Sequence, residues 1–229
     1  MRNMMRELDV RLVMRTGEAR DHFCQFCEQH GLVVADQRHP GNGVTASWRE
    51  EIGEADRRLL STARHYDLVV LARPTRPNGL PPDLLEQLLM GSGRPLLIVS
   101  AEPPPSLDTI MVCWKETAEA ARAVAASIPF LANAKRVIIA AVEEGDPSLS
   151  NNVADLCRQL AWHGITAKIE LISSHGRPAS EVLLASARSQ RADLLVMGAY
   201  GHSRVRQVVF GGFTQSVIEA ADTAVLMMH

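Results

Sequence analysis

Two segments of the sequence, about half a chain apart, carry the same pattern of residues. Residues 59–64 and 67–72 read Leu-Leu-Ser-Thr-Ala-Arg and Asp-Leu-Val-Val-Leu-Ala, and they parallel residues 183–188 and 193–198. A further apolar run follows each copy, at 95–99 and at 223–227. A helix that leads into a short apolar strand is the building unit of α/β folds, and the spacing of the copies is too long for a solenoid repeat. The pattern therefore predicts a tandem duplication of an α/β unit.

The second repeat, 108–229, contains a complete series of alternating strands and helices. We expect strands at 109–114, 136–142, 166–172, 193–197 and 223–228, and helices at 117–130, 151–163, 178–191 and 211–220. Thr117 is the expected N-cap of the first of these helices. This alternation predicts a doubly wound, Rossmann-like parallel sheet, and such sheets bind ligands beyond the carboxyl ends of their strands. The ends of three strands then bring Trp114, Val142 and Gly198 to one rim.

The first repeat, 1–100, is shorter than the second. We expect a helix at 18–30, a strand at 44–49, a helix at 54–65 and a strand at 67–72, with the last strand at 95–99. The strand, helix and strand that open the second repeat have no room here. Either the true start lies upstream, or residues 8–14 supply one replacement strand. Three consecutive prolines make 101–107 the expected stiff linker between the repeats.

A glycine-rich stretch separates the strand at 193–197 from the helix at 211–220. Glycines let a backbone approach a ligand closely, and free amides at a helix N-terminus attract phosphate. The residues predicted to form a phosphate site are Gly198, Gly201, His202, Ser203, Arg204, Arg206, Gly211, Gly212 and Thr214. The alternative is a plain turn from strand to helix, in which the glycines only permit tight packing.

The spacing of this stretch, Gly-x2-Gly-x9-Gly, resembles the signature of the universal stress protein (UspA-type) superfamily. The resemblance implies an adenine nucleotide alpha hydrolase-like fold and ATP, with magnesium, held by the loop, while the backbone at 112–114 and 142–143 lies near adenine. Two residues depart from the family pattern: Gly212 replaces a Ser or Thr, and Lys115 replaces an acidic residue. The implied role is a response to stress by binding, and no residue is placed as a general base.

Two alternatives to a stress-response protein that acts by binding a nucleotide remain open. The first is a scaffold that dimerises through the exposed edge of the last strand, at 223–228, in addition to a pseudo-dimer of the two repeats within the chain. Closing strands of the family often pair across subunits, and this one is apolar. The second is a nucleotide-dependent transferase, which needs catalytic acids that the sequence does not provide.

Composition excludes several other functions. A net charge of −2 and an aromatic content of 4% do not favour nucleic-acid binding. The sequence has neither an apolar segment of about 18 residues nor an export signal at its start, so we expect a cytoplasmic protein. Cys24 and Cys27 form a Cys-x-x-Cys pair without further ligands at a zinc-like spacing, which predicts small buried cysteines.

A lone histidine and the three tryptophans complete the candidate residues. His175 follows a predicted strand, but no nucleophile motif accompanies it, so we expect a loop that leads into a helix with Pro178 in its first turn. Trp48, Trp114 and Trp162 are expected to anchor a core or an interface.

Overall fold

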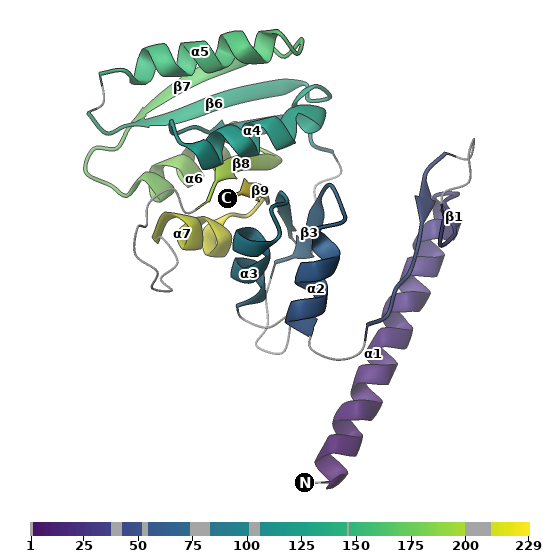
Figure 1. The fold of residues 1–229 in the computed structure, drawn as a ribbon. Helices are drawn as coiled ribbons and strands as arrows, with labels where there is room; N and C mark the ends of the chain where they lie inside the picture. The colour runs from purple at the N-terminus through teal and green to yellow at the C-terminus, as the bar shows by residue number, and fades with distance from the viewer. Residues whose placement is uncertain are drawn as a thin grey trace. The chain divides into compact units, whose positions relative to one another are not determined.

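A computed structural model describes residues 2–37, 43–51, 55–73, 83–100, 106–145, 147–199 and 212–229. The chain divides into two compact units, Met1–Gly53 and Glu54–His229, which are considered separately below. Figure 1 shows their helices and strands. The predicted boundary between the repeats, at 101–107, stays a prediction, because the compact units reflect packing rather than the repeat.

The N-terminal unit consists of a long helix and two short parallel strands. Helix α1 covers Arg2–Gln29, β1 covers Val33–Val34 and β2 covers Thr45–Ala46. Gly31 ends the helix with a φ of +62°, a conformation that glycine adopts without strain. The predicted strand at 8–14 is wrong: neither glycine nor proline occurs between residues 2 and 16, and α1 continues through this segment. Of the strand predicted at 44–49, only the two residues of β2 are in strand conformation.

The C-terminal unit is built on one seven-stranded sheet in the order β3-β4-β9-β8-β5-β6-β7. The strands are β3 (Val69–Ala72), β4 (Leu96–Val99), β5 (Thr109–Cys113), β6 (Arg136–Glu143), β7 (Ala167–Ser173), β8 (Leu194–Gly198) and β9 (Ala224–Met228). All neighbouring strands are parallel except β4 and β9, which are antiparallel. The α/β fold class, with a mainly parallel sheet, is confirmed.

Helices cover the sheet on both faces (Figure 1). They are α2 (Ala55–Ala63), α3 (Leu84–Gly91), α4 (Ala118–Leu131), α5 (Leu149–Ala161), α6 (Ala179–Gln190) and α7 (Gly212–Ala220). One apolar core holds α4 and α5 against one face, and a second core holds α2, α3, α6 and α7 against the other. The two faces are covered as the doubly wound pattern requires.

The helices and strands predicted for the second repeat are present within one or two residues of their expected ends. Thr117 is the N-cap of α4, as predicted, and its hydroxyl accepts a hydrogen bond of 3.2 Å from the amide of Ala120. Pro178 stands one position earlier than expected, at the N-cap of α6. Among the described residues, no helix combines the length and the apolar character that a membrane crossing requires.

The last strand is not at an edge of the sheet. β9 lies between β8 and β4, and Val225 pairs with Leu195 on one side and with Ile98 on the other. Its exposed fraction is 0%. The prediction that β9 offers a free edge for dimerisation is therefore wrong, because a strand of the first repeat already occupies that edge. The antiparallel β4–β9 pair joins the segments predicted to form the two repeats, and their pseudo-dimer stays a prediction.

Arg73, which follows β3, ties the first repeat to α7 and β9. One Nη donates to the carbonyl of Ile218 in the last turn of α7, and the other donates to the carbonyl of Thr223 at 2.8 Å. Burial lowers the pKa of Arg73, and nearby Asp222 acts in the opposite direction. A cation at the C-terminal end of a helix also stabilises the helix dipole.

Replacing Arg73 with Met is expected to lower the free energy of unfolding by about 2 kcal/mol, because two carbonyl groups lose a charged donor while the apolar volume stays similar. Thermal unfolding monitored by circular dichroism measures the effect. Arg158→Met is the matched control, since Arg158 makes an exposed pair with Asp155, and pairs of this kind contribute less than about 1 kcal/mol. Equal melting temperatures for the two variants would show that the hydrogen bonds of Arg73 to α7 and to Thr223 do not stabilise the fold.

Candidate functional site

The predicted rim forms at the carboxyl ends of β6, β5 and β8. β5 lies between the other two strands, and the order of the strands reverses around it, which is where open α/β sheets bind ligands. Trp114 continues from β5, and its amide donates to the carbonyl of Ala140 in β6 at 2.8 Å. Trp114 and Val142 are both half-buried, and Gly198 ends β8 on the other side of β5. The structure thus places the backbones of these three residues at one rim, whereas the side chains of Trp114 and Val142 pack against opposite faces of the sheet.

Gly198 packs against the first turn of α4. A Cβ atom at this position would lie 2.4 Å from the amide nitrogen of Ala120 and 2.7 Å from the carbonyl carbon of Glu119. Backbone atoms of a helix cannot yield to such an overlap. Close helix packing therefore requires the glycine.

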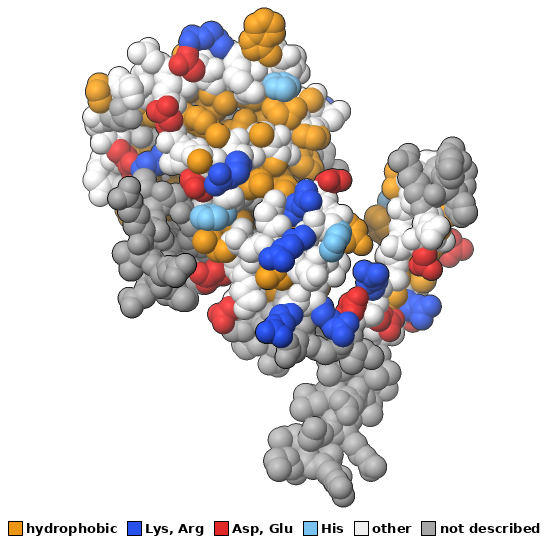
Figure 2. Space-filling view, in the orientation of Figure 1, with side chains coloured by type: hydrophobic (Ala, Val, Ile, Leu, Met, Phe, Trp, Pro, Cys, Tyr) orange, Lys and Arg blue, Asp and Glu red, His pale blue; other side chains and the backbone are white. Residues whose placement is uncertain are grey.

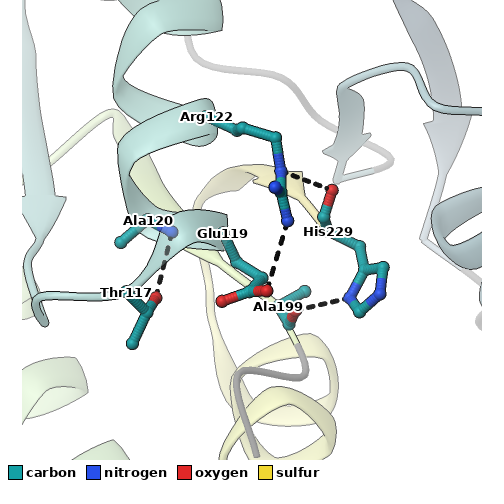
Figure 3. Close-up of polar contacts among 6 residues, drawn as sticks. All are labelled: Thr117, Glu119, Ala120, Arg122, Ala199 and His229. Atoms are coloured by element: carbon teal, nitrogen blue, oxygen red, sulfur yellow. Dashed lines mark hydrogen bonds and ion pairs between the residues drawn. The ribbon is translucent and has the colours of Figure 1, made fainter.

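Side chains of the protein occupy the N-terminal end of α4 (Figure 3). Glu119 lies in the first turn, and its pKa is lowered mainly by a hydrogen bond from its own amide, against the effect of burial. Arg122 pairs with Glu119 at 3.2 Å and donates through Nε to the carbonyl of His229 at 2.9 Å. The imidazole Nδ1 of His229 lies 3.1 Å from the carbonyl of Ala199, the last described residue before the glycine-rich stretch. These contacts leave little capacity for a phosphate at the start of α4.

The loop between β5 and α4 carries charges that are already engaged. Lys115 pairs with Glu144 at 2.9 Å, so its charge is compensated within the rim. The indole nitrogen of Trp114 donates to the side-chain oxygen of Asn152 at 2.5 Å, and the amide group of Asn152 donates to Glu116. This chain of hydrogen bonds fixes the Trp114 ring. Near the described rim the carboxylates outnumber the cations.

The predicted phosphate residues fall into two groups. Gly212 is the first residue of α7, and its carbonyl accepts a hydrogen bond of 2.5 Å from Ser216. Thr214 is 3% exposed, and this burial gives no support to a contact between its hydroxyl and a phosphate. The remaining members lie outside the described residues: Gly201, His202, Ser203, Arg204, Arg206 and Gly211.

A groove between α4 and α5 was not foreseen from the sequence. Its volume is about 520 Å³, and Trp114, Val124 and Leu156 line it together with polar side chains that include Asn151 and Gln159. Figure 2 shows hydrophobic side chains gathered between these two helices. The groove adjoins the rim at Trp114. The recurring alanines of α4 are the sequence signal for it, because small side chains leave space between neighbouring helices.

The cysteines differ from their predicted environment in part. Cys27 is buried as expected, whereas Cys24 is exposed on α1. No group of three or more metal-ligating side chains occurs among the residues that the structure describes. At the rim, burial raises the pKa of the Cys113 thiol to about 12, so this sulfur carries no charge at neutral pH and is a poor nucleophile.

His175 and the outlying tryptophans are not part of the rim. His175 has a φ of +47° and precedes Gly176 in the loop that leads into α6, as expected for a connecting segment. Trp48 contacts Phe23 within the N-terminal unit, with tilted rings whose centroids are 5.4 Å apart. Trp162 follows the last residue of α5 and is 91% exposed, so it does not anchor the core, and its role as an interface anchor stays a prediction.

Comparison with known proteins gives a consistent result. The model of the universal stress protein family matches residues 107–229, more than half of the chain. A universal stress protein of Synechocystis is 33% identical over 81 residues, which make up 35% of this chain and 27% of the relative. The chain therefore matches little more than a quarter of that relative's length.

Solved structures show the same fold at low sequence identity. A universal stress protein from Archaeoglobus fulgidus has a TM-score of 0.62 at 19% identity, over 81% of this chain and 70% of the other. A putative universal stress protein from Pseudomonas aeruginosa has a TM-score of 0.54 at 18% identity, over 86% of this chain and 81% of the other. Both similarities concern the fold alone.

Proposed function

Because this chain belongs to the universal stress protein family, we propose that its second repeat binds an adenine nucleotide at the rim formed by β5, β6 and β8. One observation carries the proposal: Trp114 and Val142 follow or end the neighbouring strands β5 and β6 where the strand order reverses, beside the start of the glycine-rich stretch. Their side chains lie on opposite faces of the sheet, and the half-buried indole of Trp114 is the one that suits the flat apolar face of adenine. The protein acts by binding, and the proposal includes no catalytic step.

Because of the charges at the rim, we assign the base and the phosphates of the nucleotide to different parts of the site. Lys115 is paired with Glu144, and Glu119 occupies the N-terminal turn of α4, so the described rim is unfavourable for several phosphates. The base lies here, near the backbone of 112–114 and 142–143. We assign the phosphates to the stretch at 200–211, because its sequence contains the cations Arg204 and Arg206 and the glycines Gly201 and Gly211. Magnesium bound to the phosphates would lessen their repulsion from the neighbouring carboxylates.

Calorimetric titration with ATP and magnesium tests the proposal, with AMP as the comparison. We expect saturable binding of ATP and at least about tenfold weaker binding of AMP, since AMP lacks two of the phosphates that the stretch would hold. Gly201→Asp is expected to abolish ATP binding, because it places a negative charge in the phosphate-binding stretch. Gly43→Asp is the matched control: it adds the same charge in the N-terminal unit, where a Cβ atom meets nothing within 4 Å.

Two results would overturn the proposal. The first is no heat of binding with ATP at any attainable concentration, for a protein that circular dichroism shows to be folded. The second is an equal loss of binding in Gly201→Asp and in Gly43→Asp, which would mean that added charge, rather than the site, determines the result.

The alternative is a protein-interaction module that has lost its nucleotide site. The observation in its favour is that the donor Lys115 is paired with Glu144 and that Glu119 places a carboxylate at the start of α4, since a phosphate-binding rim usually presents free donors. The failure of ATP to bind, together with retention of the fold, is the outcome that selects this alternative.

A further inference from the structure

The two repeats differ in how their matching strands are paired. β8 of the second repeat is paired on both edges, with β9 and with β5. The corresponding strand of the first repeat, β3, pairs with β4, and no other described strand pairs with it. The difference shows in equivalent valines: Val196 in β8 is 0% exposed, whereas Val70 in β3 is 54% exposed. β3 is therefore an edge strand at the position where its counterpart is central.

The hydrogen-bonding groups on the open edge of β3 follow from its pairing with β4. The amide of Val69 donates to the carbonyl of Pro95 at 3.0 Å, and that of Arg73 donates to the carbonyl of Val99 at 2.7 Å. Because successive residues of a strand direct these groups to opposite sides, the amides and carbonyls of Val70 and Ala72 point away from β4. They form a ready template for a further strand.

The two edges of the sheet are protected to different degrees. Natural edge strands commonly carry charged residues that discourage pairing with another chain. The other edge strand, β7, contains Lys168 and Glu170, whereas β3 reads Val-Val-Leu-Ala and contains no charged residue. An exposed aromatic side chain also precedes β3: Tyr66 is 53% exposed. Strand pairing is thus favoured at β3 and opposed at β7.

We propose that β3 pairs with β3 of a second copy of this chain, in antiparallel orientation, about a two-fold axis at Val70. Such an arrangement is self-complementary, since the same surface serves both subunits. In this register Asp67 lies opposite the partner subunit's Arg73, on the face of the strand that carries Val69 and Leu71. The guanidinium of Arg73 is already held by the carbonyls of Ile218 and Thr223, so the proposed pairing rests on the main-chain groups of Val70 and Ala72.

This interface is distinct from the pairing of the closing strands. β9 is occupied within the chain by β4, so a dimer cannot use it without breaking the sheet. The proposal also does not depend on nucleotide binding, because β3 lies at the far end of the sheet from β5 and β6 in the strand order.

Disulfide trapping tests the register. In the proposed pair, the two Val70 residues exchange hydrogen bonds and their Cα atoms lie about 5.5 Å apart, within the range that a disulfide spans. The two Ala72 residues lie about 13 Å apart, which is too far. With Cys24→Ser as the background, mild oxidation is expected to cross-link Val70→Cys into a covalent dimer and to leave Ala72→Cys, the matched control on the same face of the strand, unlinked.

Sedimentation velocity completes the experiment. The unmodified chain is expected to sediment as a dimer, and Val70→Lys is expected to weaken dimerisation at least about tenfold, because two like charges meet at the axis. Circular dichroism of Val70→Lys checks that the monomer stays folded. A monomeric mass across the whole concentration range would overturn the proposal. So would a dimer that Val70→Lys leaves unchanged, or equal cross-linking of the two cysteine variants.

Discussion

Gly198→Ala is expected to destabilise the protein by about 3 kcal/mol, a large effect for one methyl group. The added carbon would lie 2.4 Å from the amide nitrogen of Ala120 and 2.9 Å from its Cα, and both atoms belong to the backbone of α4. Either β8 or α4 must then move, and both are held by the buried cores on the two faces of the sheet. Chemical denaturation monitored by circular dichroism measures the loss.

Gly212→Ala is the control for this substitution. A Cβ atom at Gly212 meets nothing within 4 Å, and alanine is preferred over glycine within a helix, so the stability should stay equal or rise slightly. If Gly198→Ala proved as harmless as Gly212→Ala, the close contact between β8 and α4 would be incorrect. Because the glycine has this packing role, substitutions at Gly198 do not separate a loss of nucleotide binding from a loss of fold, and Gly201 is the better position to change.

Val225→Lys is expected to destabilise the C-terminal unit by about 4 kcal/mol, enough to unfold a domain of ordinary stability. Val225 is 0% exposed and lies in β9, between a strand of the first repeat and a strand of the second. The lysine would place an unpaired charge between the two repeats. The measurement is the midpoint of urea unfolding.

Val70→Lys provides the comparison for Val225→Lys. It introduces the same side chain into another strand of the same sheet, at a position that is 54% exposed, and it should change the stability of the monomer by about 0.5 kcal/mol or less. Should Val225→Lys instead leave the protein folded and only dissociate a dimer, β9 would be a free edge and the antiparallel β4–β9 pair would be wrong.

The fold of the second repeat could be predicted from the sequence because its signals are local. Apolar runs of strand length alternate with helical periodicity, and Thr117 marks a helix start with a capping residue. The part of the first repeat that shares this pattern was predicted as well, at α2, β3 and β4, whereas the residues that open it lack such signals. Residues 8–14 alternate enough to suggest a strand, but nothing interrupts the helix that contains them, and the continuity of α1 prevails.

Relations between distant segments were the part that the sequence did not reveal. Whether β9 meets solvent, a second subunit or β4 depends on which edge the first repeat presents, and the periodicity of a strand does not encode its neighbours. The same limit applies to Gly198, which packs against the backbone of α4, a helix that is distant in the sequence. Trp162 illustrates it at a single residue: an aromatic residue at the end of α5 was expected in a core or an interface, and within this chain it is exposed.

The candidate site was predicted only in part. Trp114 and Val142 reach one rim because the carboxyl ends of parallel strands share an edge of the sheet, a rule that needs no side-chain detail. The compensation of Lys115 by Glu144, and the hydrogen bonds that fix the Trp114 ring, depend on loops whose course the sequence does not specify. The groove beside Trp114 depends on the spacing between α4 and α5.

The fluorescence of Trp114 during titration with ATP and magnesium tests the location of the nucleotide most directly. The chain contains three tryptophans, so Trp48→Phe together with Trp162→Phe leaves Trp114 as the sole emitter. With adenine at the rim, the emission of Trp114 changes saturably, and the change disappears in Gly201→Asp and persists in Gly43→Asp. Unchanged emission at ATP concentrations that saturate the calorimetric signal would contradict a nucleotide site at the ends of β5 and β6.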